Sequence, residues 1–124
     1  MSACLRLAPV ASALALAACV APSDAPRGGQ ARAGDQQVMV GTEAFLARVA
    51  PDAPGLMLTA AGAKPVAGQA VAVTRAAGAM TFDEGALAKK AARAGCLAAG
   101  GRFQEAAIGG YQSTGAWLFR GACA

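Results

Sequence analysis

The sequence predicts an α+β fold in which a small antiparallel sheet packs against one main helix. Three observations predict it: short β-prone runs recur along the chain, a long helical pattern spans about 82–99, and a hairpin pattern follows near the C-terminus. A chain of 124 residues is expected to hold one folded domain. We assign residues 1–18 to a signal, 19–36 to a flexible tether and 37–124 to the domain.

The domain is predicted to open with a short strand at 38–40. A short helix is then predicted over residues 42–50, because its first residue, a threonine, is a good N-cap. Phe45, Leu46 and Val49 would share one helical face, and Pro51 and Pro54 would stop the helix.

Two further strands are predicted at 56–59 and 70–75, separated by a loop over 60–69. The loop is rich in alanine and glycine, whereas the second strand alternates larger and smaller residues. Gly78 is expected to end this strand.

The clearest helix begins at Thr81, which forms a capping-box pattern with Glu84. Acids in the first turn favour the helix dipole, so we interpret Asp83 and Glu84 as capping groups rather than a catalytic carboxylate pair. Gly100 and the glycine after it end the helix. The face predicted to pack on the sheet consists of Leu87, Ala91, Ala94 and Ala98. The opposite, solvated face carries Lys89, Lys90 and Arg93.

Residues 102–111 and 116–122 are predicted to be two strands joined by a turn of hairpin length. Alternation in the last strand puts Trp117, Phe119 and Cys123 on one face. The chain has few large side chains, so we expect the two aromatic residues to lie in the core rather than to form a ligand platform.

Residues 1–18 have the pattern of a secretory signal. Arg6 supplies a positive charge, and an apolar run of about a dozen residues follows it, which is too short for a membrane span of about 20. Pro, Gly and polar residues then dominate up to residue 36, a composition typical of a flexible tether.

The end of that run, Leu16-Ala17-Ala18-Cys19, resembles the lipobox of bacterial lipoproteins. The resemblance implies that Cys19 receives a diacylglyceryl group, that the signal is cleaved before it, and that the new N-terminus is acylated, for example with palmitate. Several acyl chains would give stable anchoring. Because Val20 follows, the resemblance favours the outer membrane, facing the periplasm, over the inner membrane. The alternatives are a plain signal peptide and a buried apolar helix.

If Cys4 leaves with the signal and Cys19 is acylated, Cys96 and Cys123 remain as a pair. An oxidising compartment favours a disulfide between them. The geometry agrees, because Cys96 lies near the end of the helix that should cover the face on which Cys123 lies. Two buried free thiols or a metal site are the alternatives, but two cysteines without histidine make a poor zinc site.

The sequence contains no histidine, which excludes Ser-His-Asp and Cys-His catalysis and the common metal sites. A phosphate-binding loop, a dinucleotide fingerprint and a Cys-x-x-Cys motif are also missing. The formal charge of +4 is scattered, so no nucleic-acid-binding pattern exists. We therefore predict no catalytic residue, cofactor, metal or nucleic acid.

These observations predict a non-catalytic protein of the cell envelope, held to the membrane through acylated Cys19, that binds a protein partner or supports an envelope complex. The alternative is a small inhibitor of an envelope or extracellular enzyme, with the exposed loop at Tyr111–Thr114 as its anchor. A hydrolase would require two carboxylates or a Ser-Lys pair in a cleft, and lipid or small-ligand binding is a further class.

Overall fold

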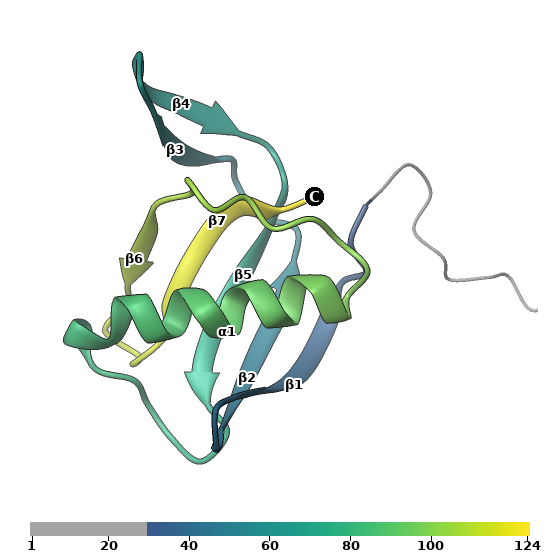
Figure 1. The fold of residues 1–124 in the computed structure, drawn as a ribbon, viewed down its shortest axis with the longest axis vertical. Helices are drawn as coiled ribbons and strands as arrows, with labels where there is room; N and C mark the ends of the chain where they lie inside the picture. Colours follow the sequence, from purple (N-terminus) through teal and green to yellow (C-terminus); the bar gives the residue numbers. More distant parts are fainter. Residues whose placement is uncertain (1–29) are drawn as a thin grey trace, which may run out of the picture.

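Five antiparallel strands and one helix form the body of the protein, and a separate hairpin stands out from it (Figure 1). The structure, a computed structural model, describes residues 30–124. The predicted signal, Cys19 and most of the predicted tether lie outside the described residues. The strands are β1 Gly34–Val40, β2 Glu43–Ala50, β3 Gly55–Thr59, β4 Gly62–Val66, β5 Gln69–Arg75, β6 Gly109–Tyr111 and β7 Trp117–Cys123. The helices are the 3₁₀ turn η2 Phe82–Glu84 and α1 Gly85–Ala98.

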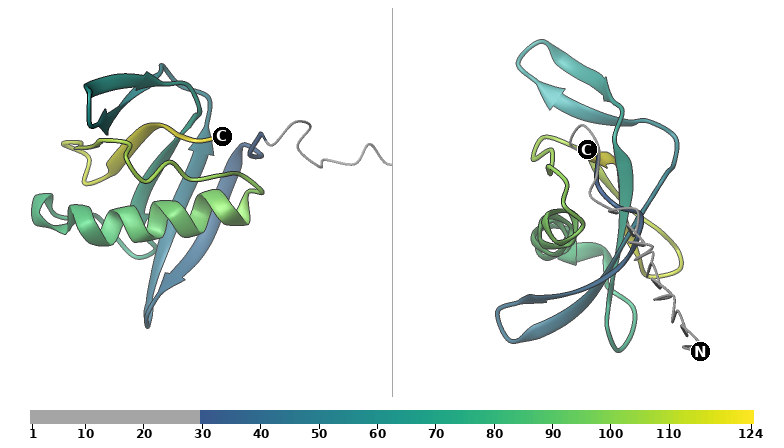
Figure 2. Two further views of the ribbon diagram at one scale, coloured as in Figure 1. Left: turned by 45° about the horizontal axis from the view of Figure 1, so that its top comes forward. Right: turned by 90° about the vertical axis from the view of Figure 1, so that its right-hand side faces the viewer.

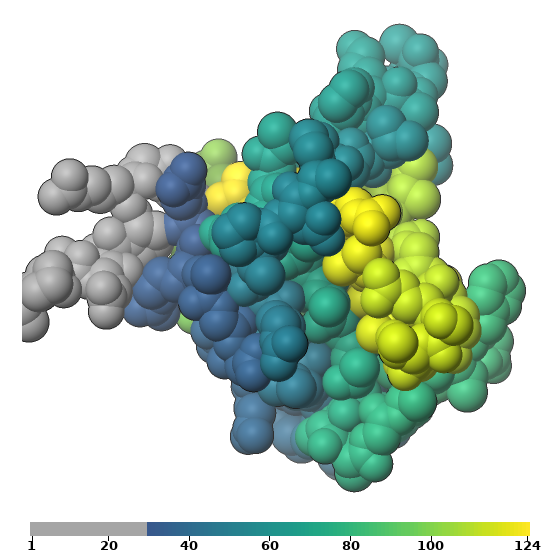
Figure 3. All heavy atoms as spheres, turned by 180° about the vertical axis from the view of Figure 1, so that it is seen from behind, coloured from purple at the N-terminus to yellow at the C-terminus, as the bar shows by residue number. Residues whose placement is uncertain are grey.

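The main sheet has the order β1-β2-β5-β7-β6, and every neighbouring pair is antiparallel. Helix α1 crosses one face of this sheet, as the side view shows (Figure 2). Because α1 is the only α-helix of residues 30–124, the opposite face of the sheet has no helix over it; Figure 3 views the molecule from that side. The predicted α+β class, with one main helix and a C-terminal hairpin, is confirmed.

The helix predicted over 42–50 is wrong, because residues 43–50 form strand β2. Phe45, Ala47 and Val49 alternate toward α1 and are fully buried, whereas the residues between them face away. Because the inward-facing residue 47 is an alanine, the sequence does not show the alternation of large apolar and polar residues that is typical of a strand. Pairing on both edges, with β1 and β5, decides the strand.

Hairpin β3–β4 forms a second sheet of two strands. The predicted strand at 56–59 is present, but the loop predicted over 60–69 contains β4 and the start of β5. Gly62, with φ of 107°, makes the turn between β3 and β4. The hairpin packs against β7 at Gly55, where a Cβ atom on residue 55 would lie 1.9 Å from the carbonyl oxygen of Arg120.

The strand predicted over 102–111 is confined to β6. A turn closed by the Ala107 N–H and the Gln104 carbonyl, 3.1 Å apart, interrupts it. Strand β7 agrees with the prediction, and Phe119 and Cys123 are buried while Trp117 is half-buried.

Helix α1 packs through small residues, as predicted, but on a face rotated from the predicted one. The buried residues are Ala88, Ala91, Ala92, Gly95 and Cys96. Leu87 and Ala94 are half-buried and Ala98 is exposed. Contact with β2 explains the rotation, since a Cβ atom on Gly95 would lie 2.4 Å from Cβ of Ala47. No helix within residues 30–124 is long and apolar enough to cross a membrane.

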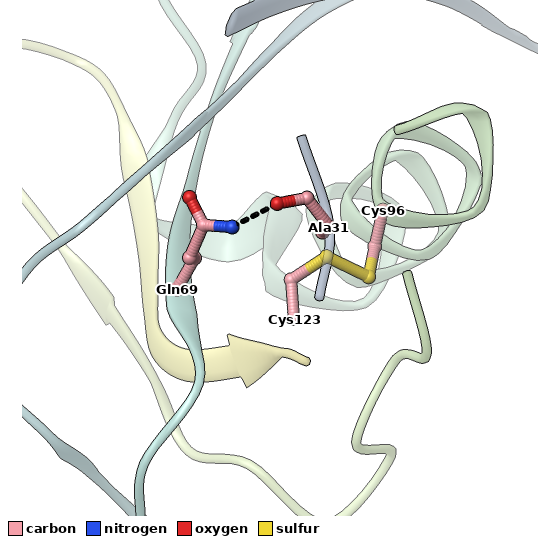
Figure 4. Close-up of a disulfide and its surroundings, with 4 residues drawn as sticks. All are labelled: Ala31, Gln69, Cys96 and Cys123. Atoms are coloured by element: carbon pink, nitrogen blue, oxygen red, sulfur yellow. Dashed lines mark hydrogen bonds between the residues drawn. A yellow bond between two sulfur atoms is a disulfide. The ribbon is translucent and has the colours of Figure 1, made fainter. Parts of the chain in front are cut away.

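The predicted disulfide joins Cys96 of α1 to Cys123 of β7, with Cα atoms 5.6 Å apart (Figure 4). The incoming chain lies beside it. The Gln69 side-chain amide donates to the Ala31 carbonyl, and the Arg32 N–H donates to the Ala99 carbonyl at 2.8 Å. Ordered contacts therefore begin before residue 37, the predicted start of the domain.

We expect loss of this disulfide to lower the free energy of unfolding. The bond closes a loop with a sequence separation of 27, and unfolded chains with such a loop are destabilised by roughly 3–4 kcal/mol in the chain-entropy description. Denaturant unfolding of the oxidised protein should be compared with that of the Cys96→Ser, Cys123→Ser double variant. Equal transition midpoints would contradict the prediction.

Candidate functional site

Large apolar side chains gather along one side of the molecule. Seven of the described large hydrophobic residues are exposed, and five of them belong to this side. We call these five the apolar edge: Leu56, Leu58, Phe82, Ile108 and Tyr111. They lie on or directly before β3, α1 and β6, and in Figure 1 β3, the start of α1 and β6 lie along one side of the fold. The other two, Met39 and Leu97, lie on β1 and at the far end of α1.

The five residues form one continuous surface. Leu56, Ile108 and Tyr111 line a cavity of about 400 Å³ on the sheet face away from α1. Leu58 and Ile108 also line a second cavity of about 420 Å³ on the α1 side. The Phe82 ring centroid lies 5.8 Å from that of Tyr111 and 6.2 Å from that of Trp117. Contiguous exposed apolar surface of this kind marks interaction sites.

Phe82 is placed outside by the cap of the helix. Thr81 is extended and acts as the N-cap, and Glu84 reaches back to accept from the Thr81 N–H at 2.8 Å. This confirms the predicted capping box. Phe82 starts the 3₁₀ turn, so its side chain points away from the core and is 75% exposed.

Arg75 ties this cap to the sheet. Its guanidinium pairs with both carboxylate oxygens of Glu84 and with Glu43 at 2.9 Å. The guanidinium, together with the Thr81 donors, lowers the pKa of Glu84 to about 2. The Glu84 carboxylate is therefore ionised and bonded within the cap, which agrees with its predicted role as a capping group.

The second cavity is a groove between α1 and β6, which we call the helix–edge groove. Its helix wall consists of Gly85, Ala86 and Lys89, its strand wall of residues 106–109, and its floor of Trp117 and Phe119. Glycine is required at two points, because a Cβ atom on Gly85 would lie 2.9 Å from the Trp117 ring, and one on Gly109 would lie 2.4 Å from the Phe119 ring.

Lys89 is the cation of this groove. It was predicted to belong to a solvated face, but it is half-buried, and its Nζ donates to the Ala107 carbonyl at 3.3 Å. Lys90 and Arg93 are exposed, as predicted. Glu105, which also lines the groove, pairs with Arg93, and this partner lowers the Glu105 pKa.

The predicted anchor loop at Tyr111–Thr114 is a tight turn. The Gln112 N–H donates to the Ala116 carbonyl at 2.8 Å, and the Tyr111 hydroxyl donates to the Met80 carbonyl at 2.9 Å. Ser113 and Thr114 are exposed at its tip. Tyr111 thus belongs to the apolar edge as well as to this turn.

Residues 30–124 contain no group of three or more histidine, cysteine or acidic residues able to hold a metal ion. No protein-family model, curated protein or solved structure matches this chain. Within residues 30–124, the apolar edge and the helix–edge groove are the candidate interaction sites.

We expect Phe82 to be dispensable for folding, in contrast to Phe119. Phe82→Ala should cost no more than about 1.5 kcal/mol of unfolding free energy, because it removes only exposed contacts between rings. Phe119→Ala should cost about 3–5 kcal/mol, because it empties a buried site. Denaturant unfolding measures both, and comparable losses would show that Phe82 is a core residue.

We also expect the cap to depend on pH. The folded-state pKa of Glu84, about 2, lies below its ordinary value of 4.5. Its contribution to stability is therefore complete above about pH 4.5 and is lost as the pH falls toward about 2. Glu84→Gln should reduce the pH dependence of unfolding in this window. Carboxyl NMR should give a depressed midpoint for Glu84 that rises in Arg75→Gln; a midpoint near 4.5 in the unsubstituted protein would refute the assignment.

Proposed function

We propose that this protein is a non-catalytic, lipid-anchored protein of the bacterial cell envelope that binds a protein partner through its apolar edge. The anchor is supported by the sequence that ends at Cys19, and partner binding is supported by the five exposed apolar residues on one side of the fold. The second observation carries the proposal, because isolated exposed apolar residues are common but a contiguous set is not.

The direction of the chain fits an anchored domain. Chain between Cys19 and Gln30, about 11 residues, reaches at most roughly 40 Å when fully extended, so the domain would stay close to the bilayer. The chain enters the fold at Ala31, beside the disulfide and the C-terminal end of α1. Phe82 lies at the N-terminal end of the same helix, away from this entry point. The apolar edge would remain accessible to an envelope protein. The residue after Cys19 favours the outer membrane, facing the periplasm.

A second candidate is a small inhibitor of an envelope or extracellular enzyme. The tight turn after Tyr111 favours it, because hydrogen bonds hold its exposed tip beside the apolar edge. An inhibitor would engage the enzyme through Ser113 and Thr114, whereas an envelope binding protein would use the apolar edge itself.

The anchor predicts a specific intact mass. Protein purified from a bacterial membrane fraction should begin at Cys19 and carry the mass of a diacylglyceryl group and an acyl chain. Cys19→Ala should leave the membrane fraction, because it has no thiol to modify. A soluble chain with an unmodified Cys19 would exclude a lipoprotein.

The apolar edge predicts where a partner touches the domain. A photo-crosslinking amino acid at Phe82 or Ile108 should give a specific crosslinked species in intact cells. Met39 and Leu97 provide matched controls, because they are apolar and exposed but lie off the edge. Crosslinks of equal yield from all four positions, or from none, would refute binding through the edge. Crosslinks from Ser113 and Thr114 alone would favour the inhibitor.

A further inference from the structure

Strand β6 leaves one side of its backbone open. It ends the main sheet and pairs with β7 only, so no strand of residues 30–124 lies on its other side. Its middle residue, Gly110, has no side chain, and nothing lies within 4 Å of where a Cβ atom would be. The other short edge, β4, carries Lys64 and Pro65, which discourage strand pairing. Strand β6 has no such protection.

The helix–edge groove meets this open edge at Gly109, the first residue of β6, and continues beside residues 105–108. Its walls on α1 are small near Gly85 and Ala86, and its floor is aromatic. A strand added to β6 would direct alternate side chains into the groove and the others away from it. A volume of about 420 Å³ accommodates apolar side chains of this kind. Strand addition to an open edge, with pockets for alternate residues, is a general mode of peptide recognition.

The charge of the groove gives the added strand a direction. None of the ion pairs of residues 30–124 includes Lys89, whose ammonium lies at the Ala107 end of the groove. Strand β6 runs from that end toward Tyr111 and Phe82. An antiparallel strand would run the opposite way, so its C-terminal end would lie near Lys89. Glu105 also lines this end of the groove, and Lys89 contributes to lowering its pKa, but the Glu105 carboxylate is paired with Arg93. A further carboxylate at that end would therefore complement the charge of Lys89.

From these observations we infer that the helix–edge groove binds an extended segment of the partner, which adds antiparallel to β6, places alternate apolar side chains over Trp117 and Phe119, and ends with a carboxylate at Lys89. This inference rests on the proposed function and specifies the partner chemistry: an apolar, β-prone segment with a C-terminal or side-chain carboxylate.

The test uses Trp117, the single tryptophan of the sequence, which lies on the groove floor. The full-length protein, purified from membranes in a mild detergent, is titrated with the peptide acetyl-Val-Thr-Val-Thr-Val bearing a free carboxylate. Saturable change in Trp117 fluorescence is expected. Hydrogen exchange of the segment containing residues 109–111 should slow, because an added strand protects edge amides.

Three changes probe the parts of the inference. Amidation of the peptide C-terminus should weaken binding about two- to fivefold, the range of an exposed ion pair, and Lys89→Gln should abolish that difference. Prolines at two adjacent central positions of the peptide should prevent binding, because alternate N–H groups of a strand face its neighbour and in either register one proline removes a backbone donor to β6. Ala86→Phe fills the groove and should weaken binding at least about tenfold.

Ala98→Phe is the matched control for Ala86→Phe, because Ala98 is also exposed on α1 but lies outside the groove. It should leave binding within about twofold of the unsubstituted protein. Unfolding midpoints of both variants report whether the fold is retained. If Ala86→Phe does not fold, the proline peptide and the hydrogen exchange still decide the outcome.

Absence of saturable binding up to millimolar peptide would overturn the inference, as would equal binding of the proline peptide. A Trp117 change on reconstitution into phosphatidylethanolamine–phosphatidylglycerol vesicles, without any response to the peptide, would assign the groove to the membrane and also overturn it. Crosslinking from Phe82 and Ile108 tests partner binding separately from peptide binding, so it shows whether the inference alone fails or the proposed function fails as well. Crosslinks without peptide binding would mean that a partner docks on the apolar edge without strand pairing.

Discussion

Helix α1 can lie close to the sheet only because the residues between them are small. Gly95 faces Ala47 with no room for a Cβ atom, and the rest of the buried helix face is alanine and cysteine. Small side chains bury little apolar area, so this packing supplies less stabilisation than a core of larger residues would. The disulfide compensates by joining the helix to β7 at the end where the contact is closest. Both the position and the stability of α1 thus follow from this close approach.

The same packing explains why large side chains accumulate at one side. Few large side chains are fully buried, Phe45 and Met80 among them. Arg75 holds the helix start to β2 and β5 through Glu43 and Glu84, which leaves Phe82 outside the core. A helix of fixed position and limited width cannot also cover β6 and the hairpin. The apolar edge therefore lies beyond the part of the sheet that α1 covers, at the start of α1, beside β6 and on the hairpin.

Much of the fold could be predicted from the sequence, because the strongest signals are local. Neighbouring residues determine the capping box at Thr81 and the alternation of β5. The disulfide links distant residues, and it could be predicted because only two cysteines remained to pair. A helix over 42–50 is the wrong prediction because Phe45 and Val49, four residues apart, fit a helical period as well as a strand, and the inward-facing residue midway between them, Ala47, is small. The apolar edge could not be predicted, since Leu56 and Leu58 have the pattern of core residues. Their exposure depends on a hairpin that stands away from the body, which is a property of the tertiary structure.

The entry of the chain beside the disulfide has a mechanical consequence. Any tension transmitted through the residues before Gln30 reaches the fold at Ala31 and Arg32, which are hydrogen-bonded to β5 and to the end of α1. Those two elements meet β7 at the covalent bond between Cys96 and Cys123. The force is therefore distributed over α1, β5 and β7 at one corner of the fold before it can separate β1 from the sheet. The opposite corner, with Phe82 and β6, does not carry this force.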